Sequence, residues 1–199
     1  MKDRLLVALI LMAVVAVAFA LQVFFLLPIL VCAVGLWEWW PLSKHPACAP
    51  WMRVGVPLGF LILPTASVLG LGDAGGLVLV ILVALTDTVA YLAGRRYGRH
   101  KLAPTISPGK TWEGFASGVL LAPAAVALSL SFFQGPPLFS FPELILLALL
   151  SQMGDLMESK LKRHLGIKDT GTWLRGHGGI MDRVDGFILA APVAWLMSV

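Results

Sequence analysis

The sequence predicts an all-α integral membrane protein with about seven transmembrane helices and a cytoplasmic N-terminus. Of its 199 residues, 58% are hydrophobic and 13% are charged, whereas about 25% of the residues in a soluble domain are charged. The apolar residues gather in runs, and about 20 apolar residues in a helix cross the hydrocarbon layer of a membrane. The same composition excludes a disordered chain, and two cysteines exclude a disulfide scaffold.

The first apolar run, residues 5–40, is interrupted only by Gln22 and Glu38. A single helix of this length would be about 54 Å long, which is too long for one crossing. We therefore expect two short spans that turn near Gln22. Five further apolar runs follow, at residues 54–71, 76–93, 114–133, 144–157 and 184–199.

The distribution of basic residues sets the predicted orientation, because Lys and Arg concentrate in cytoplasmic loops. Residues 94–113 and 159–183 hold 11 of the 15 basic residues, and residues 134–142 hold none. Seven spans with the N-terminus inside place both basic segments in the cytoplasm. The net charge of +4 does not indicate a nucleic-acid binder, because these residues sit between long apolar runs.

The N-terminus has a second interpretation, as a cleaved signal peptide. Lys2 and Arg4, the apolar run after them and the segment Ala18-Phe19-Ala20 resemble such a peptide with its cleavage site. The apolar run continues through residues 21–34, which is unusual for a mature N-terminus. Cleavage would leave the rest of the predicted topology unchanged.

Acidic residues within or beside the spans are informative, because a charge in a membrane is costly and usually faces a wet cavity or binds an ion. Asp87 lies in the middle of its run. Asp155 and Glu158 are three residues apart, as are Asp182 and Asp185, so each pair shares a helix face. Two such pairs predict a divalent-cation site that favours Mg²⁺. The alternative is ion pairing with the nearby cations Lys160, Lys162 and Arg183.

The basic segment 94–113 contains Ser107-Pro108-Gly109-Lys110-Thr111. It is not a nucleotide-binding P-loop, because Pro104 stands where that pattern has glycine and a membrane span precedes it. A glycine turn with a lysine and hydroxyls can still hold a phosphate, as can the start of the helix that follows. The alternative is a basic loop that only follows the positive-inside rule.

The basic segment 159–186 interleaves cations, acids and glycines around His177. Glycines permit close approach of the backbone to a ligand, and the mixture is typical of a site for a polyphosphate with its metal. A zinc site of His164 and His177 is disfavoured, since no third ligand lies nearby.

These segments resemble the phosphatidate cytidylyltransferases, or CDP-diacylglycerol synthases. The matching residues run from Ser159 to Arg163, then Lys168-Asp169, Gly171, Leu174, His177-Gly178-Gly179, Asp182-Arg183 and Asp185. An upstream motif is similar at Asp87-Thr88, Ala90-Tyr91, Gly94-Arg95-Arg96 and Ser107 to Gly114, and Glu38 resembles a family feature weakly. The chain departs from the pattern at Arg175, where the family usually has Pro or Gly. Family members are also generally longer on the N-terminal side.

The resemblance implies a Mg²⁺-dependent reaction of CTP with phosphatidate that gives CDP-diacylglycerol and pyrophosphate in phospholipid biosynthesis. It implies catalytic roles for Asp155, Lys162, Arg163, His177, Asp182, Arg183 and Asp185. It implies substrate contacts by Ser107, Lys110, Thr111, Ser159, Lys168, Asp169, Gly178 and Gly179. Asp155 and Asp182 would hold Mg²⁺, with Asp185 and Asp87 as supporting ligands or ligands of a second cation.

The resemblance further implies an integral protein of the inner, or cytoplasmic, membrane whose active site faces the cytoplasm, and a homodimer. Residues 1–199 would form one membrane domain, with spans 5–40 and 54–71 as scaffold and residues 76–199 carrying the catalytic spans and loops. Two alternatives stay open. The acceptor could be another lipid phosphate, of the archaeol or isoprenoid type, or the chain could be a small transporter. A CDP-alcohol phosphotransferase is disfavoured, because Asp185-Gly186 lacks the Ala-Arg of that pattern.

Overall fold

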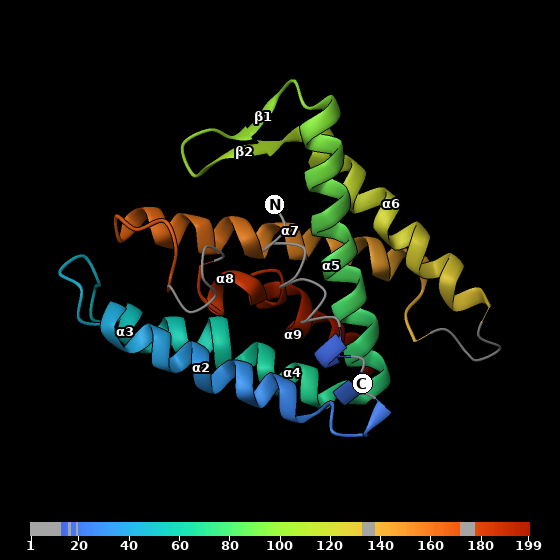
Figure 1. Ribbon diagram of the computed structural model, residues 1–199, viewed down its shortest axis with the longest axis horizontal. Helices are drawn as coiled ribbons and strands as arrows, with labels where there is room; N and C mark the ends of the chain where they lie inside the picture. The colour runs from blue at the N-terminus through green and yellow to red at the C-terminus, as the bar shows by residue number, and fades with distance from the viewer. Residues whose placement is uncertain (1–12, 16, 19, 133–137, 172–177) are drawn as a thin grey trace.

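The computed structural model describes residues 13–15, 17–18, 20–132, 138–171 and 178–199, and these are mostly helical (Figure 1). The described residues just before Gln22 are helical, and helix α2 (Leu26–Leu42) follows it. Gln22 itself has a φ of 57°, in the left-handed region. The turn predicted near Gln22 within residues 5–40 is therefore confirmed.

A continuous helix of 19 residues spans Met52–Gly70. It consists of α3 (Met52–Val56), the π-helical segment η1 (Pro57–Ile62) and α4 (Leu63–Gly70). Pro57 and Pro64 lie at the starts of η1 and α4. Because proline has no N–H to donate, the regular α-helical ladder is interrupted at these positions, and the wider π-turn accommodates the interruption.

Helices α5 (Gly72–Tyr97) and α6 (Trp112–Ser131) pack against each other beside the segment that joins them and diverge away from it (Figure 1). Glycines bring them together. A Cβ atom on Gly114 would lie 2.5 Å from the carbonyl oxygen of Ala90, and one on Gly118 would lie 2.8 Å from that of Thr86. Small residues at such contacts are the usual way for membrane helices to pack, since lipid provides no hydrophobic force between them.

A two-stranded antiparallel hairpin, β1 (Lys101–Ala103) and β2 (Ser107–Thr111), joins α5 to α6. It lies at the end of both helices in Figure 1. The hairpin corrects the all-α prediction, which expected an irregular loop at residues 94–113. The predicted helix start at the end of this segment is confirmed, since the Thr111 hydroxyl caps α6 by accepting the N–H of Gly114 at 3.2 Å.

Helix α7 (Phe141–His164) crosses α5 and packs against α9 (Phe187–Ser198), with the short α8 (Met181–Val184) before α9 (Figure 1). A capping box of Ser140 and Glu143 begins α7. The sequence placed residues 159–164 in a loop, which is wrong. The helix continues to His164, with Lys162, Arg163 and His164 in its last turn, where positive charge stabilises the helix dipole.

Within the described residues, three helices are long and apolar enough to cross a membrane, namely Met52–Gly70, Gly72–Tyr97 and Trp112–Ser131. Helices α2 and α9 are apolar but shorter, with 17 and 12 residues. The total of seven spans stays a prediction.

Two groups of buried side chains hold these elements together. The larger joins α4, α5, α6, α7 and α9 through residues such as Leu79, Leu82, Val126, Leu147 and Ala190. The smaller joins the N-terminal helices to the end of α7 and to α8, through Trp39, Cys48, Met52, Val56, Leu61, Leu165 and Met181. The smaller group therefore fixes α2 beside the chain segment that follows α7.

Candidate active site

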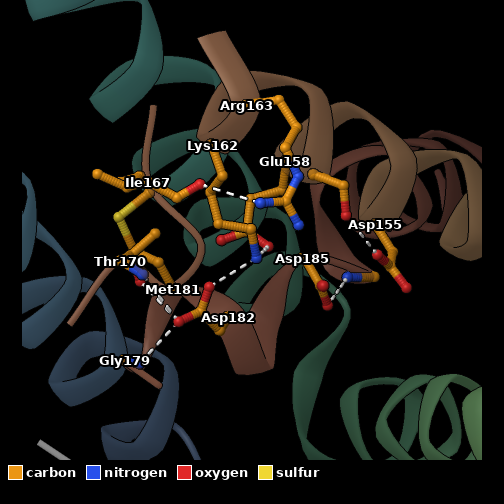
Figure 2. A network of polar contacts seen from close by, with 12 residues as sticks. Asp155, Glu158, Lys162, Arg163, Ile167, Thr170, Gly179, Met181, Asp182 and Asp185 are labelled. Atoms are coloured by element: carbon orange, nitrogen blue, oxygen red, sulfur yellow. Dashed lines mark hydrogen bonds and ion pairs between the residues drawn. The ribbon is translucent and has the colours of Figure 1, made fainter. Parts of the chain in front are cut away.

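Four acidic side chains from separate parts of the chain form one acidic cluster. Asp87 comes from α5, Asp155 and Glu158 come from α7, and Asp185 comes from the bend between α8 and α9. The other three carboxyl groups are all close enough to Asp185 to repel it electrostatically. Figure 2 draws Asp155, Glu158 and Asp185. The two acidic pairs predicted from spacing are thus near one another in space, and Asp87 joins them.

Glycines allow the bend at residue 185 to approach α7. A Cβ atom on Gly154 would lie 2.5 Å from the carbonyl oxygen of Asp185. A Cβ atom on Gly186 would lie 2.7 Å from the hydroxyl of Ser151 and from a methyl group of Val83. The nearest neighbour of Gly154 is backbone and the neighbours of Gly186 are side chains, and both glycines lie too close to them for a larger residue to fit without a shift. The two glycines therefore help to set the spacing of the acidic cluster.

Neutral and basic groups hold individual members of the acidic cluster. The buried amide of Gln152 donates to Asp87 Oδ1 at 3.1 Å, and the hydroxyl of Ser159 donates to Asp155 Oδ1 at 3.3 Å. The positive charge of Arg183 acts on Asp87 from the exposed side of α8. The predicted residues Ser159 and Arg183 therefore lie beside the acids rather than apart from them.

Lys110 reaches the acidic cluster from the hairpin. Its Nζ atom lies 2.5 Å from Oδ2 of Asp155, and both side chains are about four-fifths buried, with relative exposures of 19% and 22%. The hairpin of the upstream motif and helix α7, which are distant in the sequence, therefore meet in space at this ion pair.

Asp182 holds the chain on both sides of residues 172–177, which lie outside the described residues. Its Oδ2 atom accepts the N–H groups of Thr170 at 3.0 Å and Gly179 at 2.7 Å, and the hydroxyl of Thr170 at 3.1 Å (Figure 2). Burial raises the pKa of Asp182, but these hydrogen bonds and the one from Lys162 outweigh burial, so the pKa lies below its ordinary value.

Lys162 links the loop to α7. Its ammonium group donates to Asp182 Oδ1 at 2.7 Å and to Glu158 Oε2 at 3.3 Å. Burial lowers the pKa of Lys162, but the attraction of Glu158 and Asp182 is stronger and leaves the pKa above its ordinary value. The sequence left ion pairing as the alternative to a cation site. Such ion pairing is present between Lys162 and both Glu158 and Asp182.

A further carboxylate, that of Glu38, contacts the loop from α2. Its side chain is 3% exposed and accepts the N–H groups of Ile180 at 2.9 Å and Met181 at 3.1 Å. Sequence reasoning missed this contact, as it missed Thr170 and Gln152. The signals in the sequence were a lone carboxylate at the end of a long apolar run and the weak resemblance of Glu38 to a family feature, and neither indicates the partner of this side chain.

The remaining predicted residues take several positions. Arg163 donates to the carbonyl of Ile106 at 3.2 Å and to that of Ile167 at 3.4 Å, so it ties the hairpin to the end of α7. Lys168 and Asp169 are exposed, Ser107 is half-buried at the start of β2, and Gly178 has a φ of 77°. His177 lies outside the described residues, as does Arg175. The predicted roles of these residues in binding stay predictions.

The acidic cluster fits a divalent cation by its chemistry. Carboxylate oxygens are the ligands that Mg²⁺ prefers, and Glu158 Oε1 is buried without a hydrogen-bond partner among the described residues. In the same described ranges, no three His, Cys, Asp or Glu side chains are arranged as a complete ligand set. The Mg²⁺ site therefore stays a prediction. The carboxylates that it would need lie close to one another.

The comparison with known families agrees with this arrangement. The family model described as the cytidylyltransferase family matches residues 72–199, which include α5, the hairpin, α7 and the loop up to α9. The chain belongs to the cytidylyltransferase family.

Individual relatives carry a more specific name. The chain is 43% identical over 132 residues to the phosphatidate cytidylyltransferase of Mycobacterium leprae (strain TN), covering 63% of this chain and 41% of that protein. It is 39% identical over 172 residues to the protein of the same name from Brucella abortus biovar 1 (strain 9-941), covering 84% of this chain and 62% of that protein. It is 47% identical over 116 residues to the protein of the same name from Staphylococcus aureus (strain COL), covering 57% of this chain and 44% of that protein. The matched part is thus less than two thirds of the length of each relative.

Proposed function

We propose that the chain transfers a cytidylyl group from CTP to phosphatidate. An oxygen of the lipid phosphate attacks the α-phosphorus of CTP and forms the new phosphorus–oxygen bond. The bond between the α-phosphorus and the oxygen that bridges to the β-phosphorus breaks. CDP-diacylglycerol and pyrophosphate are the products, and the step consumes no oxidant or reductant.

The contact between Lys110 and Asp155 is the observation that carries this proposal. It brings a basic glycine turn to an acidic cluster, and both lie within the matched family region. The chemical obstacle is the approach of an anionic lipid phosphate to an anionic triphosphate. Fixed cations beside a cation site are the groups that reduce this repulsion and stabilise a leaving pyrophosphate.

No strong general base is needed in this reaction. The second pKa of a phosphate monoester is about 6, so the attacking phosphate is already largely ionised at neutral pH. We therefore assign His177 to orienting a substrate phosphate. Lys110, Lys162 and Arg183 are the cations closest to the acidic cluster, and in this proposal they contact the phosphates of CTP. Lys168 and Ser107 would extend the phosphate contacts.

A magnesium ion would be held in this proposal by Asp155 and Asp185, with Asp87 as a supporting ligand or the ligand of a second cation. The ion would supply positive charge to the phosphates. Asp182 is also a ligand predicted from the sequence, but its two oxygens already accept hydrogen bonds from Lys162 and the loop. We assign Asp182 to holding the loop.

The proposal extends to the membrane. The apolar helices support an integral protein, and we propose seven spans with a cytoplasmic N-terminus in the inner membrane. The acidic cluster would then face the cytoplasm, where CTP is found, and the lipid would arrive by diffusion within the bilayer. A homodimer is part of the same proposal.

The test is incorporation of radiolabelled CTP into chloroform-extractable lipid by the purified chain, with phosphatidate micelles and Mg²⁺. The proposal expects labelling that depends on phosphatidate and is abolished by EDTA. A folded protein that labels no lipid under these conditions would contradict it. Other lipid phosphates would then be offered as acceptors.

A further inference from the structure

The carboxylate of Glu38 joins the N-terminal part of the chain to the loop of the candidate site. Glu38 lies on α2, outside residues 72–199, to which the family model applies. Its two oxygens are divided between two donors, with Oε1 accepting the N–H of Ile180 and Oε2 accepting that of Met181. These two residues immediately precede Asp182, which holds the same loop from the other side.

Two glycines, one on each side of residues 172–177, leave space for this carboxylate. A Cβ atom on Gly171 would lie 2.8 Å from Glu38 Oε1, and one on Gly179 would lie 2.5 Å from Oε2. The Glu38 side chain therefore fills the space between the two chain segments on either side of residues 172–177. We refer to Glu38, Gly171, Gly179, Ile180 and Met181 as the Glu38 clasp.

A buried carboxylate needs strong compensation, because a charge inside or beside a membrane span is costly. Glu38 is 3% exposed, and Trp39 beside it belongs to the smaller buried group that also contains Leu165 and Met181. The helix that presents the carboxylate is thus packed against the chain segments that the carboxylate holds. Packing and hydrogen bonding fix the same relationship between α2 and the loop.

We propose that Glu38 is a positioning residue for cytidylyl transfer, an inference that rests on the proposed function. It holds Ile180 and Met181, and through them sets the position of Asp182, Arg183 and Asp185 relative to α7. Both of its carboxylate oxygens accept backbone N–H groups, so in this proposal it acts through the loop and not by contact with substrate. The N-terminal helices therefore do more than cross the membrane, since one of them fixes the geometry of the loop that carries the site.

The test compares Glu38→Gln with Glu38→Asp and with Glu143→Gln. Glutamine has a similar shape but one acceptor oxygen in place of two, so one N–H loses its partner. Aspartate keeps both acceptors on a shorter side chain. Glu143→Gln is the matched control, because Glu143 also accepts a backbone N–H, from Ser140 at 2.6 Å, at the opposite end of α7 from the loop.

The first measurement is hydrogen exchange of peptides that cover residues 178–184, in detergent and without substrate. Loss of a hydrogen bond to a charged group should raise the exchange rate of the amide that donated it by about tenfold or more. We expect exchange at Ile180 and Met181 to accelerate by about that factor in Glu38→Gln, to a smaller extent in Glu38→Asp, and not at all in Glu143→Gln. Gly171→Ala would displace the carboxylate, so it should accelerate the exchange of the same two amides.

The second measurement is the rate of CDP-diacylglycerol formation as a function of CTP concentration. We expect kcat/KM for CTP to fall by about tenfold or more in Glu38→Gln, with partial recovery in Glu38→Asp and wild-type values in Glu143→Gln. Unchanged exchange at Ile180 and Met181 would overturn the inference, and so would accelerated exchange with unchanged CTP kinetics.

The exchange comparison uses no substrate, which separates this inference from the proposed function. If the wild-type chain makes no CDP-diacylglycerol, the proposed function fails. The exchange rates then decide alone whether Glu38 holds the loop.

Discussion

The Nζ atom of Lys110 lies 2.5 Å from Oδ2 of Asp155, and this ion pair joins the β1–β2 hairpin to α7. Asp155 is repelled by Asp87 and Asp185, so the lysine offsets part of the negative charge of the acidic cluster. In the proposed function, the same ammonium group contacts a substrate phosphate that approaches the cluster. Lys110 is therefore the residue at which the hairpin and α7 meet.

Removal of the Lys110 charge should impair turnover. We expect Lys110→Met to reduce kcat/KM for CTP by about 10- to 100-fold, since a hydrogen bond to a charged group contributes about 1.5–3 kcal/mol. Steady-state kinetics at fixed phosphatidate measure the change. Lys101→Met is the matched control, because Lys101 is exposed on β1 of the same hairpin. Equal effects of the two substitutions would show that general positive charge, and not the contact with Asp155, is what matters.

Neutralising either Asp155 or Asp185 should abolish transfer while leaving the protein folded. Asp155→Asn and Asp185→Asn keep the size of each side chain but remove the negative charge that a cation needs. Mg²⁺ titration of activity is the measurement, with Asp73→Asn as the control because Asp73 lies in the first turn of α5, far along the helix from Asp87. Near-normal turnover in both variants would refute the assignment of the acidic cluster.

Close packing of α5 and α6 should be intolerant of added volume. A side chain at Gly114 would meet the carbonyl oxygen of Ala90, which is backbone and cannot rotate away. We expect Gly114→Val to lower the stability by about 1–3 kcal/mol, the usual cost of overpacking. Thermal unfolding in detergent measures this, and Gly59→Ala is the control because a Cβ atom there has no neighbour within 4 Å. A Gly114→Val protein as stable as wild type would mean that the helices are farther apart.

Low pH should remove the contribution of Asp182 to the free energy of unfolding. The pKa of Asp182 in the folded protein is lowered, so its contribution to stability is present above the ordinary aspartate pKa and is lost as the pH falls through the folded pKa. Asp182→Asn replaces one of the two charged partners of the half-buried Lys162 by a neutral amide, and we expect a loss of about 2 kcal/mol at pH 7, the range of a hydrogen bond to a charged group. Unfolding free energies of both proteins across the acid range measure the difference. It should shrink as the pH falls, and a difference independent of pH would contradict the sign of the pKa shift.

Sequence reasoning predicted those features that depend on local chemistry. The turn at Gln22 and the start of α6 after Thr111 follow from a break in an apolar run and from a capping side chain. The neighbourhood of Asp155, Glu158 and Asp185 follows from helical spacing at the ends of two consecutive apolar runs. The turn and the helix start are each encoded within a few residues of the chain, whereas the neighbourhood of the acids also needed the order of the spans.

The features that the sequence did not predict depend on contacts between distant segments. Nothing local to Glu38 indicates that it accepts hydrogen bonds from Ile180 and Met181, because that contact requires α2 to pack beside α8. The contact of Arg163 with the carbonyl of Ile106 in the hairpin was likewise not foreseen, and the predicted contact of Arg163 with phosphate stays a prediction. The hairpin itself was missed because its strands are short and lie between two apolar helices, where a basic loop was the simpler expectation.

The most direct measurement of the central claim is a comparison of two CTP preparations, labelled at the α-phosphate or at the γ-phosphate, with the purified chain, phosphatidate and Mg²⁺. Cytidylyl transfer predicts that the α label enters the lipid fraction and that the γ label is released as pyrophosphate. Asp155→Asn should give neither product. Entry of the γ label into lipid would indicate phosphoryl transfer instead, and labelled lipid from Asp155→Asn at the wild-type rate would contradict the site described above.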